Sequence, residues 1–206
     1  ELKALQSQIN PHFLYNTLDS IIWMAEGRKY EEVVLMTASL ARLLRQSISN
    51  EDEVVPLARE VEYAKGYLTI QKMRYKDKLE FEIDVEPSIL NIPLIKLVLQ
   101  PIIENAIYHG LKYKESKGLL QVKGFMKDGN AVLQVIDNGV GMDEETLSHI
   151  YDKHKVNYHS NGVGVYNVQK RLKLYYGENY GITYESEKGV GTTATIIIPG
   201  IQEESI

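Results

Sequence analysis

The sequence contains no cysteine among its 206 residues, which excludes disulfides, thiolate metal sites and cysteine nucleophiles. A lack of cysteine is compatible with a reducing compartment. No apolar run approaches the roughly 18 residues that a membrane-spanning helix requires. The first residues, from Glu1 to Leu5, have helical character and include neither a signal peptide nor an initiator methionine. We therefore expect a piece of a longer chain that extends on the N-terminal side.

Positive charge is also in deficit. The chain has 23 Lys and Arg against 28 Asp and Glu, a formal net charge of -5, which argues against nucleic acid as a partner. The apolar content of 44% and the charged content of 25% are those of an ordinary globular protein. Its length fits one large domain or two small ones.

The N-terminal quarter has the pattern of two consecutive amphipathic helices. Apolar residues recur at helical spacing over residues 1–26 and again over residues 30–48. Pro11 interrupts the first pattern, where it predicts a kink or a fresh helix start, and Gly27 is the predicted end. A helical hairpin cannot close a core by itself, so we expect two copies to pair into a four-helix bundle.

The rest of the chain mixes helical and strand periods. A charged break at residues 50–53 is the candidate hinge, and Pro87 and Pro93 bracket a loop. Helical patterns are predicted for residues 57–75, from Leu94 to about Gly110, and for residues 165–176. Strands are predicted for residues 79–85, 119–126, 131–136, 182–187 and 192–198. The second and third strands are predicted to form one hairpin, and the fourth and fifth another.

Two polar side chains interrupt the apolar helical pattern of the stretch Pro101–Gly110. Glu104 and Asn105 are adjacent there. A carboxylate beside an amide suits an oxygen-loving cation and a polarised water or hydroxyl. From this stretch alone, an amphipathic helix with two polar residues at its rim is an equal alternative.

Glycine pairs follow further along the chain. Asp137-Asn138-Gly139-Val140-Gly141 comes directly after a predicted strand; its carboxylate can accept a hydrogen bond from an exocyclic amine such as that of adenine, and its glycines permit close backbone approach. Gly162-Val163-Gly164 precedes a predicted helix, where backbone N–H groups can face phosphate. An ordinary turn is the commoner explanation of the first motif alone, and a flexible turn is an equal alternative for the second.

His12 follows Pro11, and Asn16 lies four residues later on the same predicted helix face. A lone histidine on a helix is most often an ordinary surface residue. Its interpretation therefore depends on the other motifs and on their order along the chain.

The ordered set of motifs resembles the ATP-binding domain shared by sensor histidine kinases, DNA gyrase, heat-shock chaperones and mismatch-repair ATPases. The stretch Gln8–Asn16 resembles the phosphoacceptor box of the LytS/YesM-like branch of two-component sensor histidine kinases, and residues 73–75 and 100–106 match the same branch. The resemblance implies an α+β fold. The implied parts are a dimerisation and phosphoacceptor hairpin at 1–50, a hinge at 51–56 and, at 57–206, an α/β sandwich whose mixed sheet is covered by helices on one face.

The resemblance also implies residue roles. His12 would be the phosphoacceptor, Glu104 the base or water-orienting group, and Asn16 a group that positions a water for dephosphorylation. Asn105 would be the direct protein ligand of Mg²⁺. The implied ATP-binding residues are Asn105, His109, Lys112, Asp137, Gly139, Gly141, Gly162, Gly164 and Thr193. The implied lid residues Lys153, His154 and Lys155 are candidates for screening the γ-phosphate.

The implied function is that of the cytoplasmic kinase core of a bacterial membrane sensor, which uses ATP and Mg²⁺ to phosphorylate His12. The implied partners are a second copy and the receiver domain of a response regulator, with membrane contact only through a missing sensor portion. Phe13 stands where an acidic neighbour is common, so the group that deprotonates His12 stays open. Alternatives are a serine protein kinase or ATPase on the same fold, and a non-catalytic dimeric scaffold; the Pro-His hairpin and the intact Asp137 argue against them.

Overall fold

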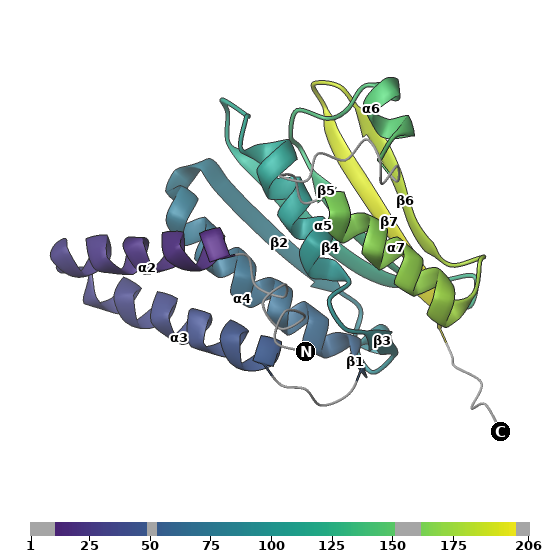
Figure 1. The fold of residues 1–206 in the computed structure, drawn as a ribbon, viewed down its shortest axis with the longest axis horizontal. Coiled ribbons are helices and arrows are strands. Elements are labelled where there is room, and N and C mark those ends of the chain that lie inside the picture. Colours follow the sequence, from purple (N-terminus) through teal and green to yellow (C-terminus); the bar gives the residue numbers. More distant parts are fainter. Residues whose placement is uncertain (1–10, 49–52, 151–161, 201–206) are drawn as a thin grey trace.

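The computed structural model describes residues 11–48, 53–150 and 162–200. A helical hairpin of α2 (Pro11–Glu26) and α3 (Tyr30–Ile48) lies at one side of the molecule. Helix α4 (Leu57–Tyr75) lies between this hairpin and an α/β sandwich (Figure 1). The observed architecture confirms the predicted α+β fold.

Local sequence signals account for the hairpin. Helix α2 begins at Pro11, a residue favoured in the first helical turn because its missing N–H has no helical partner to lose. It ends before Gly27, whose N–H donates to the carbonyl oxygen of Trp23 at 3.0 Å. Residues 1–10 lie outside the described part, so the kink prediction there stays a prediction.

Helix α4 covers the inner face of the hairpin. The rings of Phe13 on α2 and Tyr67 on α4 stack with centroids 5.0 Å apart. Met36 and Leu40 of α3 are buried in the same continuous core as the sandwich. The inner face of the hairpin is thus buried by α4 of the same chain, and the pairing of two hairpins into a four-helix bundle stays a prediction.

Five strands form one mixed sheet in the order β2-β4-β5-β7-β6. Strand β2 runs parallel to β4, and all other neighbours are antiparallel. The strands are β2 (Leu79–Val85), β4 (Gly118–Lys127), β5 (Asn130–Asp137), β6 (Gly181–Glu187) and β7 (Gly191–Pro199). Their bounds confirm all five strand predictions to within one residue at each end.

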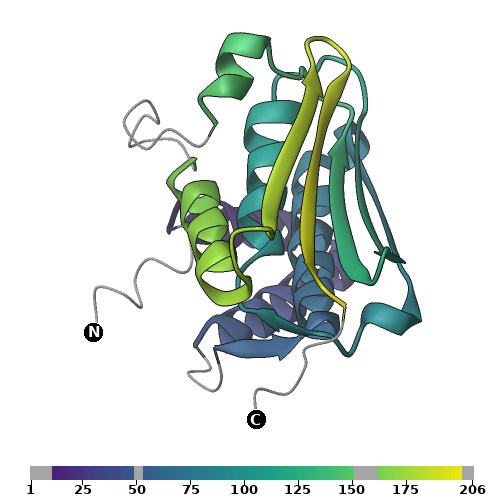
Figure 2. The ribbon, with the colours of Figure 1, turned by 90° about the vertical axis from the view of Figure 1, so that its right-hand side faces the viewer.

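The helices α4, α5 (Leu99–Asn105) and α7 (Gly162–Tyr176) cover one face of this sheet (Figure 2). Alternate residues of β4 and β5, such as Val122 and Leu133, are fully buried beneath them. This alternation is the period of two that predicted the strands. No helix among the described residues has the length and apolarity needed to cross a membrane.

Two short strands differ from expectation. Strand β1 (Val54–Pro56) pairs antiparallel with β3 (Pro93–Ile95). Residues 54–56 of the predicted hinge are thus held in a small sheet, while residues 51 and 52 lie outside the described part. Leu94, which we assigned to a helical pattern, lies in β3, and that helix starts only at Leu99.

The helix carrying the Glu-Asn pair changes its winding. After Asn105 it continues as a wider π-helical segment, η3 (Ala106–Leu111). Such segments are rare and often occur at functional sites. A small 3₁₀ turn (η2, Pro87–Ile89) fills the loop between the two prolines, and another (η1, Lys76–Lys78) joins α4 to β2.

Candidate functional site

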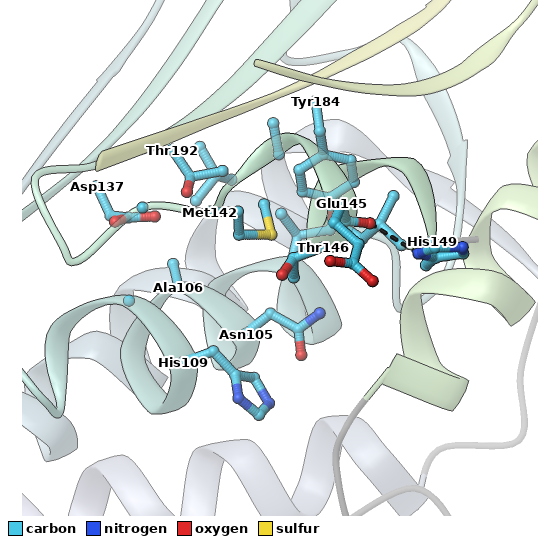
Figure 3. Close-up of a pocket in the computed structure, with 16 residues that line it drawn as sticks. Asn105, Ala106, His109, Asp137, Met142, Glu145, Thr146, His149, Tyr184 and Thr192 are labelled. Carbon is cyan, nitrogen blue, oxygen red and sulfur yellow. Dashed lines mark hydrogen bonds between the residues drawn. The ribbon is translucent and has the colours of Figure 1, made fainter. Parts of the chain in front are cut away.

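A cavity of about 580 Å³ opens between α5, η3 and the inner face of the sheet. Figure 3 shows Asp137 and His149 at opposite ends, with Asn105 and His109 on one helix beneath. Its walls are largely apolar, and a few polar groups converge on it, as is usual for small-molecule sites. The lining residues are Ile102, Asn105, Ala106, His109, Gly110, Val135, Asp137, Gly141, Met142, Glu145, Thr146, His149, Ile150, Tyr184, Thr192 and Ala194.

Asp137 ends strand β5 and is the buried carboxylate of the cavity. Its Oδ1 accepts a hydrogen bond from the Gly139 N–H at 2.8 Å. A methyl group at Gly139 would lie 2.5 Å from the backbone of Gly110, so this turn packs directly on η3. Burial raises the pKa of Asp137 to about 6, against the lowering effect of backbone donors from Gly139 and Thr192 and of the Lys114 charge.

Gly141 completes the turn with a positive φ of 63°. A Cβ there would lie 1.9 Å from the carbonyl oxygen of Glu187. The backbone thus approaches the β6–β7 turn, and the N–H of Gly189 donates to the Val140 carbonyl at 2.7 Å. Only glycine fits this position, which lines the cavity beside Asp137.

Asn105 lines the cavity from the last turn of α5. Its Oδ1 is buried and has no hydrogen-bond partner within the part of the chain that the structure describes. Leaving such an oxygen unpaired costs about 1–3 kcal/mol, so this atom fits a role as ligand to a hard cation. His109 lines the cavity one turn later; burial and then the Lys112 charge lower its pKa.

A cation held here would need ligands beyond the side chains of the protein. The described residues contain no group of three or more acidic, histidine or cysteine side chains placed to bind a metal. Mg²⁺ commonly keeps several waters and is shared with substrate phosphates. The donor set therefore fits Mg²⁺ that arrives with a nucleotide.

Glu104 faces a different environment from its neighbour Asn105. It is half-buried, and its Oε1 accepts a hydrogen bond from Gln100 Nε2 at 2.8 Å. It does not line the cavity and lies near Tyr67 of α4. Burial raises the pKa of Glu104, and the Gln100 donor opposes that shift.

Two of the residues predicted to bind the nucleotide, Thr193 and Lys112, do not line this cavity. Thr192 lines the cavity, because it pairs directly with Asp137 and directly paired residues face the same side of a sheet. Thr193 is on the opposite face of the sheet and does not line this cavity, so its predicted role near the base stays a prediction. Lys112 lies outside the cavity with its Nζ 5.7 Å from the Tyr113 ring centroid, whereas Lys114 donates to the Asn138 carbonyl beside Asp137.

The glycines before α7 occupy its first turn. The helix begins at Gly162, and a Cβ at Gly164 would lie 3.2 Å from Pro101 of α5. Gly164 thus allows α7 to pack closely on the helix that carries Asn105. Gly164 does not line the cavity, and Lys153, His154 and Lys155 lie outside the described residues.

Helix α6 (Glu144–Ser148) was missed by the sequence reasoning and contributes Glu145 and Thr146 to the cavity. Asp143 caps it, accepting from the Thr146 N–H at 3.0 Å. An aspartate three residues before a threonine, followed by acidic residues, is a helix-start signal that could have revealed it.

His12 lies outside the cavity, on the exposed side of α2. The side-chain nitrogen of Asn16 lies 3.0 Å from its Nε2 and 3.1 Å from its Nδ1. Their neighbour Phe13 is buried against α4. The packing of Phe13 therefore fixes this turn of α2 while leaving the imidazole open to solvent.

The sheet order, the covering helices and a cavity closed by an Asp-Gly turn define an ATP-binding domain. The family model described as "Histidine kinase-, DNA gyrase B-, and HSP90-like ATPase" matches residues 91–202, and a "Histidine kinase" model matches residues 1–79. The chain belongs to this ATPase family, within its sensor histidine kinases.

Curated relatives narrow the group to the LytS/YesM branch. The chain is 37% identical over 199 residues to sensor histidine kinase YesM of Bacillus subtilis, covering 97% of this chain and 33% of the relative. It is 33% identical over 184 residues to sensor protein LytS of Oceanobacillus iheyensis, covering 87% of this chain and 31% of the relative. The chain thus spans about a third of the length of these relatives.

Solved structures agree on the fold. The histidine kinase domain of the blue-light-activated histidine kinase from Erythrobacter litoralis aligns with a TM-score of 0.54 at 15% identity, covering 96% of this chain and 92% of the other. The catalytic domain of histidine kinase ThkA also aligns with a TM-score of 0.54, covering 72% and 99%.

Proposed function

We propose that this chain is the kinase core of a sensor histidine kinase, which transfers the γ-phosphoryl group of ATP to His12. The observation that carries the proposal is a solvent-exposed imidazole on a helix packed against the same α4 that borders the nucleotide domain. Phosphoryl transfer requires placement and charge neutralisation more than covalent chemistry from the protein. The cavity would bind the nucleotide, and His12 would supply the nucleophile.

Different residues of the site would contact the adenine, the cation and the phosphates of the nucleotide. In its ionised form, Asp137 accepts a hydrogen bond from the adenine amine, while the apolar walls at Val135 and Ala194 hold the ring. Bound Mg²⁺ neutralises phosphate charge, and Asn105 Oδ1 is the atom that would hold it. The backbone amides at Gly162 and Gly164, in the first turn of α7, are suited to face the phosphates.

On the acceptor side, the Asn16 amide orients the imidazole of His12, since its nitrogen can donate to the unprotonated ring nitrogen. Glu104, which lies on the α4 side of its helix, is the candidate base, oriented by Gln100. The same Asn16 would position a water for dephosphorylation, in which water takes the phosphoryl group and inorganic phosphate leaves. A phosphorylated His12 would pass the group to an aspartate of a receiver domain.

The hairpin also presents a surface for a second copy. Large apolar side chains on its outer face stay exposed, with Trp23 at 74%. A contiguous apolar face marks an interface, and α4 buries only the inner side. The exposed residues are Tyr15, Leu18, Ile22 and Trp23 on α2 and Tyr30, Val34 and Leu35 on α3. We assign this face to homodimerisation, and membrane attachment to the sensor portion of the whole protein.

The direct test is incubation with γ-labelled ATP and Mg²⁺, followed by acid and base treatment of the product. Label that is lost in acid and kept in base supports phosphohistidine. Acid-stable label would instead support a serine kinase, and nucleotide hydrolysis without label would support an ATPase. No feature of the described residues favours either alternative.

Replacing Asn105 by Ala should remove the Mg²⁺-dependent part of nucleotide affinity, because its amide oxygen is the proposed ligand. We expect about a 10- to 100-fold weaker affinity for an ATP analogue in the presence of Mg²⁺, and little change in its absence. Calorimetric titration measures both. Asn91→Ala, which changes an exposed asparagine outside the cavity, is the matched control. Equal affinity of Asn105→Ala and wild type in Mg²⁺ would contradict the assignment.

A further inference from the structure

Besides Asp137 of β5, the chain has a buried carboxylate on helix α4, and this one does not line the cavity. Glu60 is 6% exposed and lies in the first turn of α4. Its Oε1 accepts from the Leu97 N–H at 2.9 Å, and its Oε2 accepts from the N–H groups of Val98 at 2.9 Å and Leu99 at 3.1 Å. Since α5 begins at Leu99, the side chain satisfies N–H groups that the start of a helix leaves unpaired. Glu60 thus caps α5 from another helix.

The backbone that Glu60 holds is in an unfavourable conformation. Leu97 has a φ of 60°, a left-handed value that costs a bulky residue about 1 kcal/mol or more. The preceding residue is held from two further elements: the Lys96 carbonyl accepts from Arg171 Nη2 of α7 at 2.8 Å, and the Lys96 N–H donates to the Glu53 carbonyl at 3.0 Å. Strained backbone persists only when surrounding contacts over-determine it.

Helix α5 is a short connection between the hydrogen-bonded residues 96–99 and the cavity. It has seven residues, and Asn105 is the last of them. Beyond Asn105 the helix widens into η3, so the regular α-helical turns that lead to Asn105 are those that start at Leu99. A change at residues 97–99 would therefore move or rotate the Asn105 amide as well.

We propose that Glu60 is a positioning residue for the nucleotide site, which fixes α5 so that Asn105 meets the cation and phosphates of the nucleotide. Because Tyr67 on the same helix α4 stacks on Phe13, Glu60 also links the placement of Asn105 to the turn that carries His12. This role rests on the proposed function, in which Asn105 binds Mg²⁺ with ATP.

The test is Glu60→Gln, which keeps the volume but points an NH₂ donor at backbone N–H groups. We expect about a tenfold or greater loss of affinity for an ATP analogue in Mg²⁺, as for other residues that orient a metal ligand. Without Mg²⁺, affinity should stay within about twofold, because Asp137 is held at the end of β5 by the neighbouring strands β4 and β7 rather than by residues 97–99. Glu62→Gln, an exposed position on the same helix that pairs with Arg42 at 3.8 Å, should match wild type.

A merely structural role gives a different result. It would lower the melting temperature and the binding stoichiometry, while the folded fraction kept wild-type affinity in Mg²⁺; that outcome overturns the proposal. If Glu60→Gln does not fold, Glu60→Asp is the deciding variant, because it keeps the carboxylate but shortens the side chain. Reduced affinity in Mg²⁺ would then support the proposal, and wild-type affinity would overturn it. A wild-type chain that binds no Mg²⁺-nucleotide refutes the proposed function itself, whereas normal wild-type binding with unaffected variants refutes only the role of Glu60.

Discussion

Replacing His12 by Gln should abolish acid-labile phosphorylation of this chain while leaving its nucleotide affinity unchanged. Glutamine has no nucleophilic ring nitrogen, so no phosphoramidate bond can form at this position. The lining residues that the structure describes lie on other parts of the chain, between α5 and β7, and the exposed His12 is no part of the packing that supports them. We expect label from γ-labelled ATP to fall to background, and the analogue affinity measured by calorimetry to match wild type.

The matched control is Asn16→Ala, which removes the amide beside the ring but keeps the nucleophile. We expect it to label more slowly, by severalfold, because the imidazole is less well oriented. Label on His12→Gln at the wild-type level would place the phosphoacceptor elsewhere. Loss of nucleotide binding in this variant would show that His12 supports the fold rather than the chemistry.

Elements with a local signal were predictable from the sequence. The bounds of α3 and α4 follow from apolar periodicity, and β2 follows from its strict alternation. The turn at Asp128 and Gly129, both with positive φ, was marked by its residue types. In each case, the residues that specify the element lie within it.

Elements set by long-range pairing were not predictable. The small β1–β3 sheet joins two three-residue strands that lie far apart in sequence, and neither has room for a periodic pattern. The choice between Thr192 and Thr193 depends on the register of β5 against β7, because one step along a strand reverses the face of a side chain. The capping of α5 by Glu60 joins residues more than 35 positions apart, and an acidic residue on a helix gives no local sign of it.

The covering of the hairpin by α4 shows the same limit. Amphipathic periodicity in α2 and α3 shows that a face must be buried, and it cannot specify the partner. In the structure the inner face meets α4, and the apolar residues of the outer face remain exposed. A single hairpin thus has two apolar surfaces, of which the chain itself covers one.

Replacing Asp137 by Asn should weaken binding of an ATP analogue by about 100-fold or more, in line with the loss when a polar recognition site no longer matches its ligand. The carboxylate is the only buried acidic group among the lining residues that the structure describes. Asparagine would turn an NH₂ donor toward either the adenine amine or a backbone donor of the turn. Calorimetry at pH 8 measures the loss, and Asp84→Asn, on exposed β2 surface, should bind as wild type does.

The same variant tests the ionisation of Asp137. Burial raises its pKa from 3.8 to about 6 in the folded chain, so the folded state holds this proton more tightly than the unfolded state. The resulting stability is fully present below pH 3.8 and is lost as the pH rises to about 6, a change of about 3 kcal/mol at most. Without nucleotide, the unfolding free energy of wild type should therefore fall relative to Asp137→Asn between pH 4 and pH 6, and the difference should stay constant above pH 7.

Nucleotide binding should show the opposite trend. Because the ionised carboxylate is the acceptor for the adenine amine, wild-type affinity should decrease as the pH falls through about 6. Denaturant unfolding and calorimetry from pH 5 to pH 8 would reveal both trends. Parallel stability curves for wild type and Asp137→Asn across that range would contradict this prediction. They would show that Asp137 is already ionised at pH 5, and that burial does not raise its pKa to about 6.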